Sequence, residues 1–487
     1  MSAVALSIIT ATLLSLSLSS FNFWQFAWFG FIPLFIALEN KSLRQSFVLA
    51  YLCGIIFWAF TVYWLVHVTL LGTAILVLYL ALYFGLFGLG AAFIKKPTAK
   101  GIIFLPCFWV LLEYTRSYLF TGFPWALIGF SQSTNLPVIQ LADITGAWGV
   151  SFLVVLVNVT AYSIIRRQSK LKIYLIPAAI IFLSLGYGVV RLSYKPDLGA
   201  SRKFKISVIQ GNIPQNLKWN KQAVSFIQNN YNQLTVLAAK DNPDLIIWPE
   251  ASVPALWGQD DIEFEQVYSL ARREKISLLA GAVRLLENNY YNSALFIDRS
   301  GILRSTYNKL HLVPFGEFVP LKNIFPFLES IAPIGDITPG REYTIFKYPA
   351  DFGVLICFED LFPELSRQFV QKGARFLVNI TNDAWYKKGS APYQHFAASV
   401  FRAVENRVYL ARSANTGISG FIDPKGKILS VVNGLKGNKI FVAGFTSQDI
   451  YLEPFRRTFY NHYGDFFIVF CLLLDAGVII FILKNRK

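Results

Sequence analysis

The sequence predicts an α-helical transmembrane bundle joined to a layered α/β domain, on the basis of composition, hydropathy pattern and residue periodicity. Hydrophobic residues make up 54% of the 487 positions and charged residues only 15%, which is too apolar for a soluble protein of this length. The apolar residues are concentrated in residues 1–195 and again in 466–483, whereas residues 197–460 have the composition of a soluble domain. We therefore expect a seven-span membrane domain over 1–195, a soluble domain over 196–460, and an eighth span with its tail over 461–487.

Eight apolar segments are expected to span a membrane, because about 20 apolar residues cross the hydrocarbon core. No Lys or Arg precedes the first segment and no small-residue cleavage site is obvious, so a signal peptide is a weaker interpretation of the first two than permanent spans. The expected spans lie near residues 3–20, 22–38, 46–66, 70–94, 101–120, 147–165, 173–193 and 466–483.

Lys and Arg residues in the short loops predict the orientation of these spans, because basic residues beside a span remain in the cytoplasm. Basic clusters follow the second, fourth and sixth spans and form the tail, whereas the loops after the first and third spans have none. Both termini are therefore expected in the cytoplasm, and residues 196–460 on the outer side. The basic clusters are Lys41 and Arg44; Lys95, Lys96 and Lys100; Arg166, Arg167, Lys170 and Lys172; and Lys484, Arg486 and Lys487.

The net charge of +16 is explained mainly by this orientation signal. Residues 197–460 contain 30 Lys and Arg against 24 Asp and Glu, and 12 of the 15 remaining basic residues lie in short loops between spans or in the tail. The charge is thus not gathered on one surface for a polyanion. We do not expect a nucleic-acid partner.

Short apolar runs alternate with amphipathic segments from residue 204 onward, a pattern typical of a layered α/β domain. The expected strands are 204–210, 245–248, 277–282, 293–297, 354–357, 376–380 and 409–413. The expected helices are 221–239, 260–274, 363–373 and 392–408.

Three chemically reactive residues stand at the ends of strand-like runs, where ligands of α/β sheets tend to bind. Glu250 ends the run Leu-Ile-Ile-Trp-Pro-Glu, Lys309 follows residues 304–308, and Cys357 ends Gly-Val-Leu-Ile-Cys. Taken singly, each has a structural interpretation as a paired acid, a solvated lysine or a small buried residue. Together they suit nucleophilic catalysis. A thiol needs a base or cation to lower its pKa of about 8.5, a carboxylate can accept its proton, and an ammonium can stabilise an oxyanion.

Other kinds of catalytic site have little support. Cys357 is the only cysteine in residues 197–460, and no Gly-x-Ser-x-Gly elbow occurs. We expect neither a metal nor a cofactor, because the histidines are too scattered for a ligand motif. The histidines are His67, His311, His395 and His462, and the other cysteines, Cys53, Cys107 and Cys471, fall in apolar spans where they are expected as buried small residues.

With their flanking stretches, these residues resemble the apolipoprotein N-acyltransferase family, a membrane-embedded branch of the nitrilase superfamily. The resemblance covers essentially the whole chain. The matching stretches are Lys218-Trp219 and residues 210–215, 248–252, 308–317, 356–359, 381–385, 394–395, 402–407 and 415–419, with 123–125 and 143–146 in the membrane part.

This resemblance implies a nitrilase-like αββα sandwich and a catalytic set of known type. Phe358 departs from the tyrosine that often follows the nucleophile in this family, and residues 386–388 replace a shorter turn. The implied roles are general base for Glu250, transition-state stabiliser for Lys309, acylated nucleophile for Cys357, support for Glu317 and Glu359, and substrate positioning for Trp219.

The reaction implied by the resemblance moves a fatty acyl chain from a membrane phospholipid, through a Cys357 thioester, to the N-terminal amine of diacylglyceryl-cysteine on an apolipoprotein. Phosphatidylethanolamine is the expected donor. The expected setting is the bacterial inner membrane, with a monomeric enzyme, no cofactor and the catalytic domain on the periplasmic side.

Two alternatives remain open. A membrane-anchored amidase or nitrile hydrolase would use the same three residues with water as acceptor, although a single anchor would suffice for it. A transporter or receptor with an external domain is the other alternative, since ionisable residues in spans often mark pathways. These residues are sparse here: His67, Glu113, Arg116 and Asp475 are the main ones.

Residues 313–340, directly after Lys309, are rich in Phe, Pro and Gly and too broken to span a bilayer. One interpretation is a loop folded onto the core of its own domain. The other is a mobile arm whose aromatic side chains, including Phe325 and Phe327, approach the outer face of the bilayer and gate access of acyl chains to Cys357.

Overall fold

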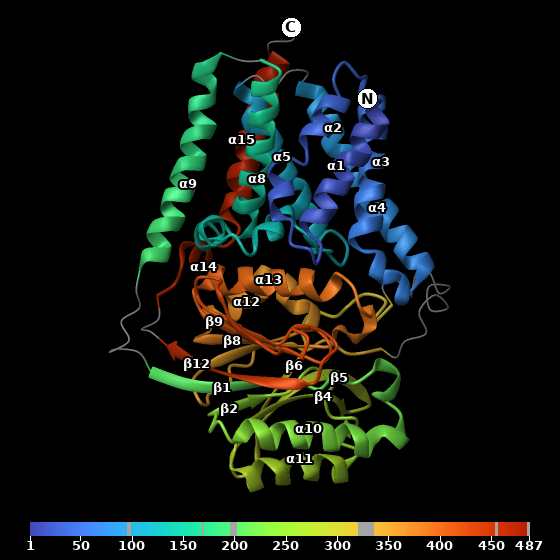
Figure 1. Cartoon of the computed structure of the whole chain (residues 1–487), viewed down its shortest axis with the longest axis vertical. Helices are drawn as coiled ribbons and strands as arrows, with labels where there is room; N and C mark the ends of the chain where they lie inside the picture. The colour runs from blue at the N-terminus through green and yellow to red at the C-terminus, as the bar shows by residue number, and fades with distance from the viewer. Residues whose placement is uncertain (95–98, 168–169, 195–201, 320–335, 453–455, 485–487) are drawn as a thin grey trace. The chain divides into compact units, whose positions relative to one another are not determined.

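The computed structural model describes residues 1–94, 99–167, 170–194, 202–319, 336–452 and 456–484, which form two compact units (Figure 1). The helical unit comprises Met1–Tyr194 and His462–Lys487. The α/β unit comprises Lys195–Asn461.

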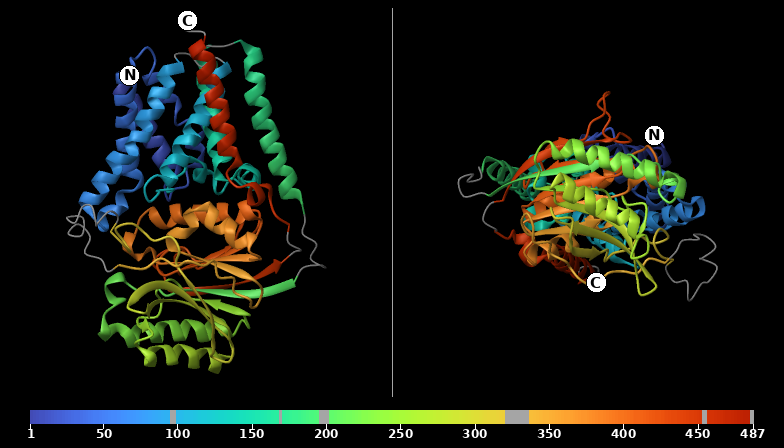
Figure 2. Two further views of the ribbon diagram at one scale, coloured as in Figure 1. Left: turned by 180° about the vertical axis from the view of Figure 1, so that it is seen from behind. Right: turned by 90° about the horizontal axis from the view of Figure 1, so that it is seen from below.

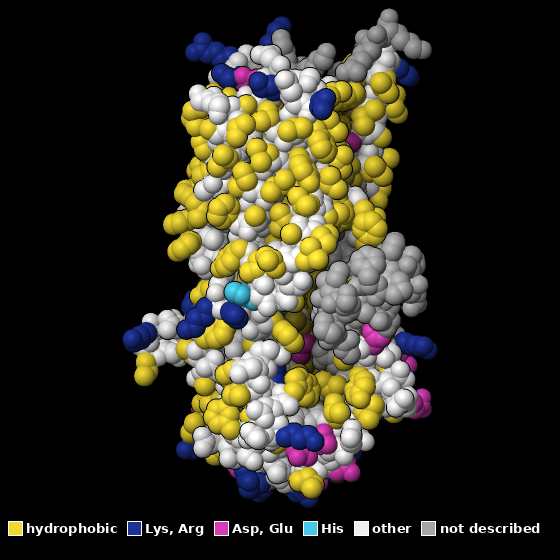
Figure 3. Space-filling view, turned by 90° about the vertical axis from the view of Figure 1, so that its right-hand side faces the viewer, with side chains coloured by type: hydrophobic (Ala, Val, Ile, Leu, Met, Phe, Trp, Pro, Cys, Tyr) yellow, Lys and Arg dark blue, Asp and Glu magenta, His cyan; other side chains and the backbone are white. Residues whose placement is uncertain are grey.

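Long apolar helices dominate the helical unit, as expected where backbone groups must be satisfied within each segment. In the described residues, five stretches are long and apolar enough to cross a membrane: Leu43–Thr61, Leu70–Ile94, Ala147–Ile165, Leu171–Ser193 and Phe466–Lys484. Figure 3 shows hydrophobic side chains covering one side of this unit, with Lys and Arg gathered at one end. Its long helices are α1 (Ala3–Ser17), α3 (Leu43–Thr61), α4 (Leu70–Ile94), α5 (Ala99–Tyr118), α8 (Ala147–Ile165), α9 (Leu175–Ser193) and α15 (Phe466–Lys484).

Residues 22–38, expected as one continuous span, instead form two short helices. Side chains satisfy the backbone groups that the break leaves without helical partners. The N–H of Phe31 donates to Asn158 Oδ1 (2.9 Å), and Asn158 Nδ2 donates to the carbonyl of Ala27 (2.8 Å). The two helices are η1 (Trp24–Trp28) and α2 (Ile32–Ala37), and the remaining short helices of this unit are η2 (Tyr63–His67), η3 (Ile128–Gln132), α6 (Leu136–Ile139), α7 (Ala142–Thr145) and η4 (Leu171–Tyr174).

Two of the ionisable residues in the apolar region, Glu113 and Arg116, form hydrogen bonds with main-chain groups of the segment that follows α5. Arg116 donates to the carbonyls of Phe123 (2.6 Å) and Trp125 (2.8 Å). The N–H of Ile128 donates to Glu113 Oε1 (2.7 Å). Both side chains therefore have structural partners, which weakens their interpretation as parts of a transport pathway.

The α/β unit contains two β-sheets with helices on their outer faces, so its described elements form an αββα sandwich (Figure 1; reverse view in Figure 2). The first sheet has the order β12-β1-β2-β4-β5-β6, with β3 paired on β4, and the second has the order β11-β10-β9-β8-β7. Ser413 joins the two sheets, because its hydroxyl contacts the carbonyls of Ile209 (2.7 Å) and Ile247 (3.1 Å). The predicted α/β class is confirmed.

The strands of the first sheet are β1 (Arg202–Gln210), β2 (Leu245–Ile247), β3 (Leu256–Trp257), β4 (Leu278–Leu286), β5 (Asn289–Ile297), β6 (Leu303–Asn308) and β12 (Gly444–Leu452). Those of the second are β7 (Phe352–Ile356), β8 (Phe376–Thr381), β9 (Tyr409–Ala414), β10 (Gly420–Ile422) and β11 (Ile428–Val431). The helices are α10 (Val224–Ala239), α11 (Asp261–Glu274), α12 (Pro363–Gln371), α13 (Ala391–Asn406) and α14 (Phe459–Tyr463), with short turns η5 (Gln215–Leu217), η6 (Lys221–Ala223), η8 (Cys357–Leu361) and η9 (Asp383–Tyr386).

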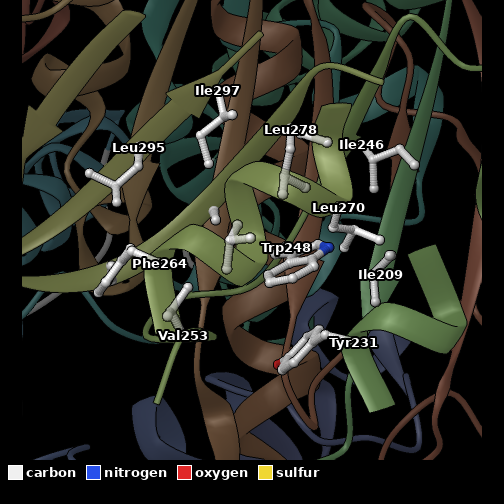
Figure 4. Close-up of a cluster of buried hydrophobic side chains, with 14 of the residues drawn as sticks. Ile209, Tyr231, Ile246, Trp248, Val253, Phe264, Leu270, Leu278, Leu295 and Ile297 are labelled. Atoms are coloured by element: carbon white, nitrogen blue, oxygen red, sulfur yellow. The ribbon is translucent and has the colours of Figure 1, made fainter. Parts of the chain in front are cut away.

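A hydrophobic core between the first sheet, α10 and α11 anchors the segment that leads to Glu250 (Figure 4). The Trp248 ring stacks on Tyr231 at a centroid distance of 4.9 Å. Its indole N–H donates to Thr235 Oγ1 (2.9 Å). Burying a large apolar side chain contributes about 1.5–3 kcal/mol, so this core holds the carboxyl end of β2 in a fixed place.

Candidate active site

Glu250, Lys309 and Cys357 meet in one buried cluster of the α/β unit. They lie beyond the carboxyl ends of β2, β6 and β7 respectively, and they are 7%, 1% and 7% exposed. Lys309 Nζ lies 3.8 Å from Glu250 Oε1, and both charges act on the Cys357 thiol. The structure therefore brings together the three residues that the sequence suggested separately.

Cys357 occupies a tight turn between β7 and η8. Its φ is +53°, a left-handed conformation that costs a non-glycine residue about 1–2 kcal/mol. Hydrogen bonds hold the turn, because the carbonyl of Cys357 accepts from Asn379 Nδ2 (3.3 Å) and from His395 Nε2 (3.2 Å).

The Cys357 thiol is neutral at pH 7 in the free protein. Burial and the Glu250 carboxylate raise its pKa, and Lys309 lowers the pKa by a smaller amount. Forming a thiolate here therefore requires a nearby group that accepts the proton at the moment of reaction. In the cluster, Glu250 is a carboxylate suited to that task.

Glu317 keeps Lys309 charged. Its Oε2 accepts from Lys309 Nζ (2.7 Å) and from the N–H of Val313 (2.8 Å). Burial opposes the charge on Lys309, but Glu317, Glu250 and Cys357 together raise its pKa above the ordinary value. The ammonium is thus a permanent cation between two carboxylates.

Glu359 connects the Lys309 segment to the Cys357 turn. Its Oε1 accepts from the Tyr307 hydroxyl (2.8 Å) and from the N–H groups of Leu310 (2.7 Å) and His311 (3.1 Å). Its Oε2 accepts from the N–H of Ile356 (2.7 Å). Burial raises the pKa of Glu359 to about 7, against the effect of these hydrogen bonds. This single side chain fixes the spacing of two candidate catalytic segments.

Asn292, on β5, is a site residue that the sequence analysis missed. Its Nδ2 donates to Glu250 Oε1 (2.7 Å) and to Glu317 Oε1 (2.8 Å). Its main-chain carbonyl accepts from the N–H of Lys309 (2.8 Å). The available signal was a polar side chain directly beside the apolar run of β5, since buried polar groups need partners.

A buried ionic network lies on the other side of the Cys357 turn. His395 contacts Asp383 Oδ1 through Nδ1 (2.9 Å) and Asp360 Oδ1 through Nε2 (2.8 Å). Arg412 contacts Asp360 Oδ2 (2.8 Å) and Asp383 Oδ2 (3.4 Å). Burial and Arg412 lower the pKa of His395, but the two aspartates raise it to about 9. The charged imidazole also donates to the carbonyl of Cys357 and so helps to hold the nucleophile turn.

The remaining predicted site residues lie at the margin of the cluster. Trp219 is 53% exposed and follows Lys218, whose Nζ donates to the carbonyl of Glu250 (2.9 Å). Phe358 is buried, with its ring 5.3 Å from that of Phe362 and 6.1 Å from that of His311. An unsubstituted phenyl ring suits this aromatic packing. Among the described residues, no group of three or more His, Cys, Asp or Glu side chains is arranged to hold a metal ion.

The expected arm over residues 313–340 is described only at its two ends; Phe325 and Phe327 lie outside the described residues. Main-chain hydrogen bonds join the described residues at its end to Glu317 and Lys309 of the cluster. The N–H of Ile337 donates to the carbonyl of Glu317 (2.8 Å), and the N–H of Gly340 donates to that of Lys309 (2.7 Å).

The chain matches two families of known proteins. Residues 205–452 match the carbon-nitrogen hydrolase family, which is just over half of the chain, and residues 10–160 match the apolipoprotein N-acyltransferase N-terminal domain. The α/β unit is therefore a carbon-nitrogen hydrolase domain. An amidase of the nitrilase superfamily from Nesterenkonia AN1 is similar over 52% of this chain and 91% of its own, with a TM-score of 0.40 at 18% identity.

Relatives that match along most of the chain identify its family more specifically. The chain is 37% identical to an apolipoprotein N-acyltransferase of Geobacter metallireducens, over 99% of this chain and 95% of that protein. It is 34% identical to one of Rickettsia typhi (75% and 74%) and 28% identical to one of Thermotoga maritima (99% and 94%). The chain belongs to the apolipoprotein N-acyltransferase family, which confirms the resemblance drawn from its motifs.

Proposed function

We propose that this enzyme transfers a fatty acyl chain from a membrane phospholipid to the N-terminal amine of diacylglyceryl-cysteine on apolipoproteins, with Cys357 as nucleophile. The observation that supports this best is the buried cluster in which the Cys357 thiol interacts with the Glu250 carboxylate and the Lys309 ammonium. The family named by the full-length relatives supports the substrates.

In the first step, Glu250 accepts the Cys357 proton as the sulfur attacks the ester carbonyl of the phospholipid. Lys309 stabilises the negative charge that develops on the carbonyl oxygen. The tetrahedral intermediate collapses by breaking the ester C–O bond, and Glu250 returns the proton to the departing lysophospholipid oxygen. The acyl group is then a thioester on Cys357.

In the second step, the α-amine of the apolipoprotein attacks the thioester carbonyl. Glu250 accepts the proton that the nitrogen loses, Lys309 again stabilises the oxyanion, and the C–S bond breaks. The thiolate recovers its proton from Glu250, so the products are an amide and the starting enzyme. In this scheme Glu317 and Glu359 hold the reacting segments, and the exposed Trp219 positions substrate.

The proposed membrane arrangement has eight spans, with both termini in the cytoplasm and the α/β unit on the periplasmic side of the bacterial inner membrane. The basic clusters in the short loops support this orientation. Phosphatidylethanolamine is the proposed donor. A monomer is the proposed active form, because one chain supplies the whole described cluster.

The persistence of the acyl-enzyme separates a transferase from an amidase-like hydrolase. After incubation with phospholipid, intact mass should show an acyl adduct on Cys357 that remains in buffer, because a transferase must protect its thioester from water. Adding a diacylglyceryl peptide with a free N-terminus should discharge it, whereas an N-acetylated peptide should not. Release of free fatty acid at the same rate without acceptor would support the hydrolase instead.

Asn292→Leu is expected to slow acylation of Cys357 by about 10²-fold. The substitution removes two hydrogen bonds to charged groups, each contributing about 1.5–3 kcal/mol, and leaves the Glu250 and Glu317 carboxylates less well positioned. The rate of adduct formation from phospholipid measures the effect. Asn289→Leu, an exposed position on the same strand, is the matched control and should acylate normally. Equal rates in the two variants would show that Asn292 is not needed to hold the carboxylates.

A further inference from the structure

Lys218 is a buried cation beside the cluster that the proposed mechanism does not use. It follows η5 (Gln215–Leu217) and is 4% exposed. Its Nζ donates to the main-chain carbonyl of Glu250 (2.9 Å). Within the described part of the chain, that carbonyl is the one hydrogen-bond acceptor it contacts. An ammonium has three N–H donors, so two of them remain for other groups.

Carboxylates neutralise the charge of Lys309 more than that of Lys218. Lys309 is paired with Glu317 at 2.7 Å and with Glu250 at 3.8 Å. Lys218 has no carboxylate within 4.0 Å among the residues that the structure describes. Glu250 and Cys357 both raise the pKa of Lys218, so its charge interacts with each of them. Burying a charged group costs free energy unless the group is paired with an opposite charge or hydrogen-bonded.

We infer that Lys218 is a second cation of the catalytic centre: a positioning residue that fixes the main chain at Glu250 and stabilises the Cys357 thiolate through its field. This inference rests on the proposed function, in which Cys357 must ionise to attack an ester. The other groups that act on the thiol are Glu250 and Asp383, which oppose ionisation, and Lys309 and the Thr381 hydroxyl, which favour it. Asp383 is already engaged by His395 and Arg412.

The protonation state of Lys218 agrees with this role near neutral pH. Burial lowers its pKa to about 8, while Glu250 and Cys357 act in the opposite direction. Most Lys218 side chains are therefore charged at pH 7, and the charge is lost as the pH rises through about 8. The support for the thiolate should accordingly be strongest below that pH.

Alkylation of Cys357 by iodoacetamide provides a readout that a purely structural role would not change, because its rate follows the thiolate fraction. The peptide containing Cys357 would be quantified by mass spectrometry across about pH 6 to 10 in full-length Lys218→Met, Lys218→Arg and Lys221→Met. Lys221 is an exposed lysine of the neighbouring turn η6 and is the matched control. Lys218→Met should alkylate about ten-fold more slowly at neutral pH, equivalent to a pKa rise of about one unit. Lys221→Met should match the parent protein, and Lys218→Arg should retain most of the rate.

If the alkylation rate of Lys218→Met has the same pH dependence as that of the parent protein, the inference is overturned. If the melting temperature of that variant is also lower, Lys218 has a structural role alone. Loss of alkylation in Lys218→Arg equal to that in Lys218→Met would also overturn it, since the charge would then be irrelevant. Acyl-adduct formation by the parent enzyme with phospholipid tests the proposed function separately. A shifted alkylation profile without any acyl adduct would leave Lys218 as a modulator of the thiol and reject the acyl-transfer mechanism.

Discussion

Cys357→Ala is expected to reduce N-acylation of a diacylglyceryl peptide by roughly 10⁴-fold or more, since losing a covalent nucleophile removes the reaction path itself. No hydroxylamine-labile adduct should form with phospholipid. The fold should survive, because alanine tolerates the left-handed turn about as well as cysteine and leaves only a small void. Product formation and intact mass, with melting temperature measured alongside, would test these expectations.

The other cysteines supply the controls for this experiment. Cys53, Cys107 and Cys471 are buried in the helical unit, so replacing each with alanine should leave acyl transfer within a few-fold of the parent. Cys357→Ser should also fail, because a serine hydroxyl is a far weaker nucleophile than a thiol without a base matched to it. Full turnover by Cys357→Ala would reject the thioester mechanism.

The parts of the fold that could be predicted from sequence are those in which burial decides the residue pattern. The strands β2, β7 and β8 are wholly buried, although β7 ends the second sheet, and their apolar runs mark them clearly. The candidate catalytic residues were visible for the same reason: Glu250 and Cys357 each interrupt such a run. A reactive side chain directly after a buried strand is an unusual combination.

Five described strands were absent from the expected ranges: β3, β6, β10, β11 and β12. β10 is buried but only three residues long, and most of the others lie at or near the sheet edges. β6 and β12 end the first sheet, and β11 ends the second. Their residues are mostly only partly buried, so the strands lack the apolar pattern on which the prediction depended. The break in residues 22–38 was hidden for a different reason. Partners such as Asn158 are far away in sequence, and they stabilise a conformation that hydropathy alone does not distinguish from a continuous span.

The supporting residues of the site were hidden because their roles depend on pairing. Asn292 matters because it bridges two carboxylates from different segments. His395 matters because two aspartates and Arg412 surround it. Each is an ordinary residue in its own stretch, and only the folded arrangement gives it a function.

Lys309→Met and Glu250→Gln are both expected to slow acylation of Cys357 by phospholipid by about 10²–10³-fold or more, the usual cost of removing a group that stabilises a transition state. They should nevertheless change the thiol in opposite directions. Lys309 lowers the pKa of Cys357, so its loss should raise that pKa and slow alkylation by iodoacetamide at neutral pH. Glu250 raises the pKa of Cys357, so its loss should lower that pKa and speed alkylation.

The opposite signs separate electrostatic effects from proton transfer. Glu250→Gln keeps an oxygen that can accept from Asn292 Nδ2, so its fold should be retained while the capacity to accept and return a proton is lost. A variant whose thiol ionises more readily but is not acylated would show that Glu250 acts as the base rather than merely tuning the nucleophile. Normal adduct formation in Glu250→Gln would show that Glu250 has a structural role and is not the base. Slower alkylation in that variant would contradict the electrostatic account of the site, because removing a negative charge beside a thiol must favour the thiolate.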